Sequence, residues 1–257
     1  LPGDKKTYVM SAQSAQHILL TEEGVREDTI QKLITRAEQG QADLAWIARK
    51  VAQKKLSPEM VDEITKAKSG ISWKRLQTCV ENQDLFELET FNKLGRKLQG
   101  LFGQLQTVEF LNNLDPGITL RTEMQVMSQS VDIVAAVSKP VKVPQCQTFD
   151  AVTDTVQTVS LKLRPPQGCA IECKAWKTAS YRREGNIDVL EHEVRQTLSV
   201  FNTVIVFVTS DFNKLPDTTK TDIVRRVTES GGYLKVLPGF SSVSAAYQAG
   251  MFITFLG

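Results

Sequence analysis

One uninterrupted apolar run limits the architectures open to this chain. The run "TVIVFVTS" spans residues 203–210 and contains no charged side chain. A strand with one solvent-exposed face alternates apolar and polar residues, whereas a strand covered on both faces is apolar throughout. The run therefore predicts the central strand of a sheet that has other elements packed on both of its faces.

Further strand-like segments occupy the second half of the chain. The turn-forming sequence Asp115-Pro116-Gly117 marks the change to β-rich sequence. The expected strands are 118–126, 130–137, 155–163, 168–176 and 232–239, with helices at 187–200 and 217–230. This order of elements predicts an α/β (α+β) fold with a mixed central β-sheet flanked by helices.

The first half of the chain has a different pattern. Residues from about 22 to 114 show the apolar spacing of helices. Ser57-Pro58-Glu59 is a helix start signal, and Gly70 is a helix stop. We expect an N-terminal helical module over 1–98 and a second domain over 99–257.

Composition sets looser limits. The 257 residues carry a net charge of +2, from 31 basic and 29 acidic residues. This balance neither predicts nor excludes a nucleic-acid partner, because a local basic patch would suffice. No apolar run is long enough for a membrane span, so no membrane partner is expected. The first residue is Leu1 rather than Met, which suggests a part of a longer chain.

The cysteines indicate a compartment. Cys79, Cys146, Cys169 and Cys173 show no spacing typical of a zinc site. We interpret them as reduced, buried thiols, which predicts an intracellular, reducing compartment, cytoplasmic or nuclear.

The stretch "GCAIECKAW" (168–176) places two opposite charges inside an apolar strand. Glu172 and Lys174 are two residues apart, so a strand presents both on one face. Upstream, Asp132 lies in the strand-like "SVDIVAAV" and Glu109 in the helical "GQLQTVEFLNNL". A salt bridge along the strand explains most E-x-K triplets, but the ordered set of acids favours a metal site.

This ordered set resembles the PD-(D/E)XK nuclease superfamily, which has a restriction-endonuclease-like fold. The nearest pattern is that of Holliday-junction resolvases and RecB-type nuclease domains. The resemblance covers residues from about 100 to 239 and is carried by "EFLNNL", "VDIVAAV", "AIECKAWK" and "VRQTLSVFNTVIVFVTS".

The resemblance implies a role for each residue of the set. Asp132 and Glu172 would hold a divalent metal, Mg²⁺ or Mn²⁺, and Glu109 would support that metal or a second one. Lys174 would orient the attacking water, and Gln196 matches a polar residue that the family often carries on the following helix.

Elementary chemistry points the same way. Phosphodiester hydrolysis needs a hydroxide nucleophile and neutralisation of a dianionic transition state, and a hard divalent ion held by carboxylates supplies both. Carboxylates placed close together repel each other without a cation. Lys174 lies about 6–7 Å along the strand from Glu172, within reach of metal-bound water or a phosphate oxygen.

The segment 138–167 leaves one alternative open. Asp132 and Glu172 are forty residues apart (132 to 172), so the proline-bearing 138–167 is expected to be an insertion or an extended hairpin. If it formed core strands instead, Asp150 or Asp154 would be the ligand in place of Asp132.

Basic residues follow the predicted site directly. Lys177, Arg182 and Arg183 are interleaved with Trp176, a combination suited to phosphate contact and base stacking. A solvated loop with a packed Trp176 would give the same pattern.

We therefore expect a metal-dependent endo- or exonuclease that hydrolyses phosphodiester bonds of DNA or RNA. Many members of the resembled family dimerise, so a homodimer is possible. The alternative is a catalytically inactive nuclease-like domain that acts as a nucleic-acid-binding or protein-assembly module.

Overall fold

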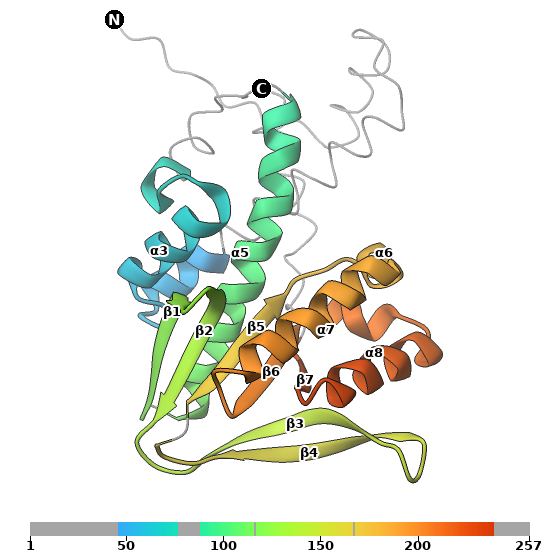
Figure 1. Ribbon diagram of the computed structural model, residues 1–257. Helices are drawn as coiled ribbons and strands as arrows, with labels where there is room; N and C mark the ends of the chain where they lie inside the picture. Colours follow the sequence, from blue (N-terminus) through green and yellow to red (C-terminus); the bar gives the residue numbers. More distant parts are fainter. Residues whose placement is uncertain (1–45, 77–87, 116, 167, 239–257) are drawn as a thin grey trace, which may run out of the picture.

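The computed structural model describes residues 46–76, 88–115, 117–166 and 168–238 (Figure 1). The helical pattern predicted before residue 46 lies outside the described residues, and so does Cys79.

The centre of the fold is one seven-stranded sheet. Its order is β1-β2-β5-β6-β7-β3-β4, with β5, β6 and β7 parallel and the other neighbours antiparallel. The predicted mixed sheet is thus confirmed, and the apolar run supplies its middle strand, β6. The strands are β1 (Ile118–Val126), β2 (Gln129–Val137), β3 (Val141–Asp150), β4 (Thr155–Leu163), β5 (Cys169–Lys174), β6 (Thr203–Val208) and β7 (Tyr233–Val236).

Helices cover both faces of this sheet (Figure 1). Helices α3 and α5 pack on one face, and α7 and α8 pack on the other. Among the described residues, no helix is long and apolar enough to cross a membrane. The helices are α3 (Pro58–Ser69), α5 (Leu88–Leu114), α6 (Thr178–Tyr181), α7 (Glu184–Leu198) and α8 (Asp217–Glu229), with a 3-10 helix, η1, at Ser210–Lys214; residues 46–52 and 73–76 are also helical.

Strand β6 shows why both faces need cover. Its alternate side chains point to opposite sides, and each side enters a separate hydrophobic cluster. Ile205 and Phe207 pack with Leu105 of α5, whereas Val206 packs with Leu190 of α7. All five of these side chains are fully or almost fully buried. The uninterrupted apolar sequence of β6 is therefore a direct consequence of two-sided packing.

Helix α3 begins and ends where its sequence signals indicate. The Ser57 hydroxyl accepts the backbone N–H of Met60 at 3.2 Å, and Pro58 occupies the first helical position. Gly70 follows the helix with φ +77°, and its N–H bonds the Lys66 carbonyl. These two caps fix the two ends of α3, and the C-terminal cap fixes the position of the side chains in its last turn.

The described part of 1–98 shares a core with the sheet. Ile47 and the α3 residue Ile64 are fully buried in the same cluster as Leu101 of α5 and Ile133 of β2. Helix α5 runs continuously from 88 to 114, across the expected boundary at 98/99. Elements from both sides of that boundary therefore form one hydrophobic cluster.

The segment 138–167 contains strands β3 and β4, which form a long antiparallel hairpin. A register shift between Val143 and Cys146 bends β3. Beyond it, Cys146 and Gln147 pair with β7, which joins the hairpin to the sheet. The Phe149 N–H also donates to the Thr228 hydroxyl of α8 at 3.0 Å.

Candidate functional site

The predicted strand acid lies where β2 and β5 separate. Their pairing runs from Ala135–Cys169 to Ile133–Ile171. Beyond this point the Asp132 side chain replaces the backbone of β2 as hydrogen-bond partner of β5, because its Oδ2 accepts the backbone N–H of Cys173 at 2.8 Å. Cys173 is the residue between Glu172 and Lys174. Asp132 is therefore brought directly to the E-x-K motif, although forty residues separate 132 from 172.

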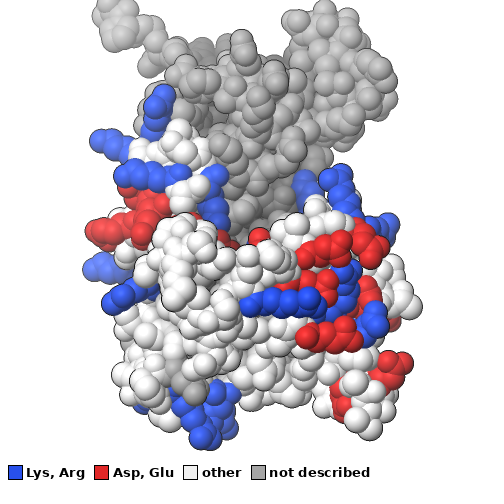
Figure 2. Space-filling view, viewed as in Figure 1, with Lys and Arg blue, Asp and Glu red and all other residues white. Residues whose placement is uncertain are grey.

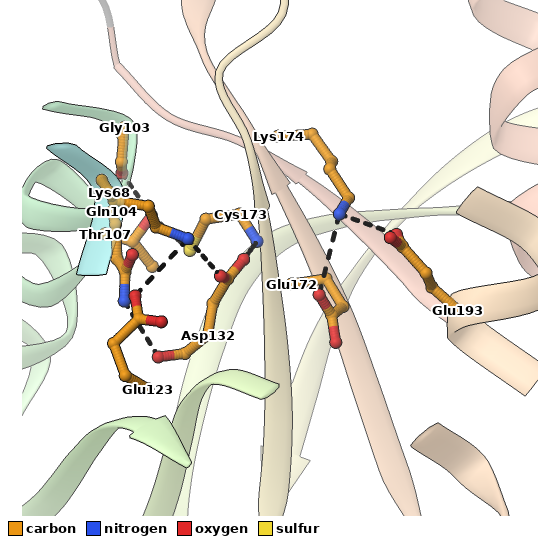
Figure 3. A network of polar contacts seen from close by, with 10 residues as sticks. All are labelled: Lys68, Gly103, Gln104, Thr107, Glu123, Asp132, Glu172, Cys173, Lys174 and Glu193. Carbon is orange, nitrogen blue, oxygen red and sulfur yellow. Dashed lines mark hydrogen bonds and ion pairs between the residues drawn. The ribbon is translucent and has the colours of Figure 1, made fainter. Parts of the chain in front are cut away.

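A distortion of β1 accompanies this separation. Thr122 pairs with Ile133 and Met124 with Val131, so the pairing skips the residues between them. Glu123, one of the skipped residues, has φ +50°, a left-handed conformation that is uncommon for a residue other than glycine. The carboxylates of Glu123 and Asp132 face the same ammonium group (Figure 3).

That ammonium belongs to Lys68, in the last turn of α3. Its Nζ lies 2.6 Å from Asp132 Oδ1 and 3.4 Å from Glu123 Oε1. Gln104 of α5 donates to the backbone carbonyl of Asp132 at 3.0 Å. Asp132 is thus held by α3, α5 and β5 together.

Glu172 lies on the other side of β5. Its side chain is 6% exposed, and its Oε1 accepts a hydrogen bond from the Thr197 hydroxyl of α7 at 3.4 Å. Burial raises the Glu172 pKa to about 7; Lys174 opposes this rise, while Asp132 and Glu193 add to it. Of these two acids, Asp132 adds more to the rise than Glu193 does.

Lys174 lies closer to the carboxylate of Glu193 on α7 than to that of Glu172 on its own strand. Its Nζ lies 2.7 Å from Glu193 Oε2 and 3.8 Å from Glu172 Oε2. Burial lowers the Lys174 pKa, but attraction to Glu193, Glu172 and Asp132 outweighs this effect, so the pKa is raised. Lys174 therefore carries its charge at neutral pH.

Figure 3 shows the two halves of the site on either side of β5. Cys173 faces α5, where its Sγ lies 3.5 Å from the Thr107 hydroxyl, and its neighbour Glu172 faces α7. The carboxylates outnumber the ammonium groups: Glu123, Asp132, Glu172 and Glu193 surround Lys68 and Lys174. This end of β5 consequently carries an excess of negative charge when all four acids are ionised.

The other two expected site residues lie apart from this network. Glu109 Oε1 pairs with Lys50 Nζ at 2.6 Å, beside a cavity that Trp46 and Leu237 also line. Gln196 is half-buried on α7, but the α7 side chains that contact Glu172 and Lys174 belong to Thr197 and Glu193.

Sequence reasoning missed Glu193, Thr197 and Lys68. The first two are four residues apart on α7, beside the buried stripe that includes Leu190 and Val194, so helical spacing offered a signal for them. Lys68 carries no such signal, because 64 residues separate it from Asp132.

The alternative ligands lie within the hairpin. Asp150 accepts hydrogen bonds from the Val152 N–H at 2.9 Å and the Gln157 amide at 2.7 Å. Asp154 is exposed in the turn that joins β3 and β4. The contacts found for Asp150 are local ones that close the hairpin turn.

The donor set suits a small, hard cation. Mg²⁺ keeps several waters and is commonly bound by one or two carboxylates together with substrate phosphates. Asp132 and Glu172 provide two carboxylates, and a cation would relieve the repulsion between them. In the described ranges, no three or more His, Cys, Asp or Glu side chains are placed to hold a metal jointly.

The expected nucleic-acid residues surround α6. Lys177, Arg182 and Arg183 are exposed, and Figure 2 shows basic side chains at the end of the molecule where α6 lies. Trp176 is half-buried and packs edge-on against Tyr181, with ring centroids 5.3 Å apart. Part of the Trp176 ring therefore contributes to packing.

The described cysteines match the interpretation as thiols. Cys146 and Cys169 are buried and Cys173 is partly buried, and all three are free. Burial raises the pKa of Cys146 to about 11, so this thiol is protonated at neutral pH.

Comparison of the chain with protein-family models, with curated proteins and with solved structures found no match to any of them. The function is therefore inferred from the residues and their geometry.

Proposed function

We propose that this chain is a metal-dependent nuclease whose reaction centre lies at the carboxyl end of β5. The observation that carries the proposal is the 2.8 Å hydrogen bond from the Cys173 N–H to Asp132. This hydrogen bond joins Asp132 of β2 to the E-x-K motif of β5. Strand β5 in turn pairs with the apolar central strand β6. Mg²⁺ or Mn²⁺ is the cation that this carboxylate chemistry favours.

Each side chain has a distinct task under this proposal. Asp132 and Glu172 would hold the cation, which when bound would lower the pKa of a water molecule and neutralise charge on the phosphate. Lys174, charged and 13% exposed, would orient a phosphate oxygen or the attacking water. Glu193 would position the Lys174 ammonium by the 2.7 Å ion pair.

The raised Glu172 pKa fits a cation-binding role. A buried carboxylate with a pKa of about 7 is partly protonated at neutral pH. Binding of a divalent cation favours the ionised form, so metal binding should release a fraction of a proton near pH 7. Binding and proton release can both be measured by calorimetry in buffers of different ionisation enthalpy.

The substrate class follows from the basic residues near the site. Lys177, Arg182 and Arg183 would contact the phosphate backbone of DNA or RNA. Acidic side chains of α7 adjoin them: Arg226 of α8 pairs with Asp188 and Glu191, and Figure 2 shows the two charge types interleaved there. We therefore expect a narrow basic track rather than a broad basic surface.

Cleavage assays test the enzymatic role. Labelled single- and double-stranded DNA and RNA are incubated with Mg²⁺ or Mn²⁺ and with wild type, Glu172→Gln or Lys174→Met. We expect each substitution to lower the cleavage rate by roughly a hundredfold or more. Glu229→Gln, an exposed position on α8, is the matched control and should cleave like wild type. Undiminished cleavage by both folded site variants would contradict the assignment.

A second candidate function is a catalytically inactive nuclease-like domain that binds nucleic acid or assembles with a protein. The specific observation that favours it is the Lys68 ammonium, which lies 2.6 Å from Asp132. Such a domain would bind labelled nucleic acid without cutting it. Arg182→Glu with Arg183→Glu should then weaken binding in fluorescence anisotropy, whereas Lys142→Glu on β3 should not. Metal-independent binding without cleavage would select this function over the first.

A further inference from the structure

Lys68 reaches the candidate site from a helix that precedes the sheet in sequence, and 64 residues separate it from Asp132. It comes from the last turn of α3, whereas its partners Asp132 and Glu123 lie on β2 and β1. Figure 3 shows the Lys68 ammonium between the two carboxylates, on the α5 side of β5. A positive charge of this chain therefore already neutralises the Asp132 carboxylate that the proposed cation would use.

The surroundings strengthen this contact. The side chains are mostly removed from water, with exposed fractions of 25% for Lys68, 14% for Asp132 and 20% for Glu123. Burial lowers the Lys68 pKa, but attraction to Asp132, the hydrogen bond to it and attraction to Glu123 outweigh burial and raise the pKa. The ammonium is thus charged throughout the neutral range.

Helix packing holds the lysine in place. On the buried face of α3, Val61 and Ile64 belong to the same hydrophobic cluster as the α5 residues Leu101 and Leu105. Gly70 ends the helix two residues after Lys68. Because the backbone is fixed on both counts, the ammonium can leave Asp132 only by rotation of its own side chain or by movement of α3.

We propose that Lys68 is an internal competitor for the divalent cation at Asp132, so that helix α3 holds the candidate site in an occupied, inactive arrangement until metal binds. This inference rests on the proposed function and extends it. Asp132 Oδ2 accepts the Cys173 N–H and Oδ1 contacts the Lys68 ammonium, so a cation at this carboxylate would compete with that ammonium for Oδ1. After displacement, the Glu123 carboxylate would either keep its ion pair with Lys68 or contact the bound cation.

The competition predicts opposite effects on metal-free stability and on metal affinity. Lys68→Met keeps most of the apolar stem but removes the charge, so Asp132 and Glu123 lose their shared counter-ion. The metal-free variant should melt at a lower temperature. It should also bind Mn²⁺ at least roughly tenfold more tightly, because no ammonium has to be displaced.

The matched control is Lys66→Met. Lys66 lies on the same helix, pairs with Asp62 at 2.7 Å and is 60% exposed. We expect its Mn²⁺ affinity and melting temperature to stay at the wild-type values. Mn²⁺ binding is measured by calorimetric titration, and melting by circular dichroism with and without Mn²⁺.

Two further variants separate the possible outcomes. Lys68→Arg keeps the charge and can pair with Asp132 through two hydrogen bonds, so it should fold and bind Mn²⁺ roughly threefold more weakly or worse. Asp132→Asn reports whether Mn²⁺ uses this carboxylate at all. If Lys68→Met does not fold, an unchanged Kd in Lys68→Arg overturns the competitor role.

The failure of this inference is distinguishable from failure of the proposed function. Mn²⁺ binding that is lost in Asp132→Asn, but has the same Kd in wild type and Lys68→Met, overturns the competitor role and leaves the metal site standing. Absence of binding in wild type and in both Lys68 variants overturns the competitor role and the metal site together.

Discussion

On each side of β5, one lysine ammonium lies between two carboxylates, but the two lysines come from different parts of the chain. On the α7 side, Lys174 lies between Glu172 and Glu193; on the α3 side, Lys68 lies between Asp132 and Glu123. Lys174 is the more buried cation, with 13% of its side chain exposed against 25% for Lys68. Because burial limits side-chain movement, we expect the α7 side to be the more rigid half and the α3 side to be the half that opens.

The two sides should differ most in the loss of unfolding free energy when the lysine charge on each side is removed. Lys174→Met leaves the buried Glu172 without its counter-ion, which should lower the free energy of unfolding by about 4 kcal/mol. Lys68→Met acts on a more exposed pair and should cost about 1.5 kcal/mol. Urea unfolding of both variants measures the two values. Equal losses would remove the distinction between a rigid and an openable half.

The pH dependence of stability should come from the α7 side. The Glu172 pKa is raised from 4.5 to about 7 in the folded chain, so the folded state binds this proton more tightly than the unfolded chain does. Stability relative to Glu172→Gln should therefore fall as pH rises from about 4.5 to about 7 and stay constant above, by about 3 kcal/mol in all. Urea unfolding across this range, for both proteins, measures it; parallel pH profiles would mean that Glu172 is not buried as described.

Asp132→Asn sharpens the comparison from the α3 side. The amide oxygen can still accept the Cys173 N–H, but Lys68 loses its charged partner at 2.6 Å. We expect a loss of about 1 kcal/mol in metal-free stability together with loss of Mn²⁺ binding. Unchanged metal-free stability would contradict the strength given to the Lys68–Asp132 pair, and retained Mn²⁺ affinity would exclude Asp132 as a ligand.

The smallest effect is expected in the hairpin. Asp154→Asn changes an exposed turn residue between β3 and β4, so stability should change by less than about 0.5 kcal/mol, and Mn²⁺ affinity should be unchanged. The same calorimetric titration checks this. A loss of metal binding here would favour the hairpin aspartates over Asp132 as the site's second acid.

Sequence periodicity was sufficient for the fold class and for most of the elements because local patterns determine them, whereas the pairing of β3 with β7 was not predicted. The apolar run of 203–208, the caps of α3 and the strand-like segments around Asp132 and Glu172 all follow from spacing within a few residues. The site was only partly accessible in this way. Glu172 and Lys174 are neighbours in sequence, so their pairing could be predicted from strand geometry.

The missing parts depend on packing between distant elements. Lys68 meets Asp132 only because α3 packs on α5 at the sheet edge. Glu109 was expected at the site, but its position on α5 directs it to Lys50. Which side of a helix faces a site depends on how that helix packs on the sheet. Apolar spacing identifies the buried face, but several polar residues border that face, and the spacing does not select the one that reaches the site.

The central claim is that one divalent cation binds between Asp132 and Glu172. Anomalous scattering from crystals grown with Mn²⁺ tests it most directly. We expect a single strong peak bonded to carboxylate oxygens of both residues, with the Lys68 ammonium moved away from Asp132. Manganese bound elsewhere, with Lys68 still on Asp132 and Lys174 still on Glu193, would contradict it.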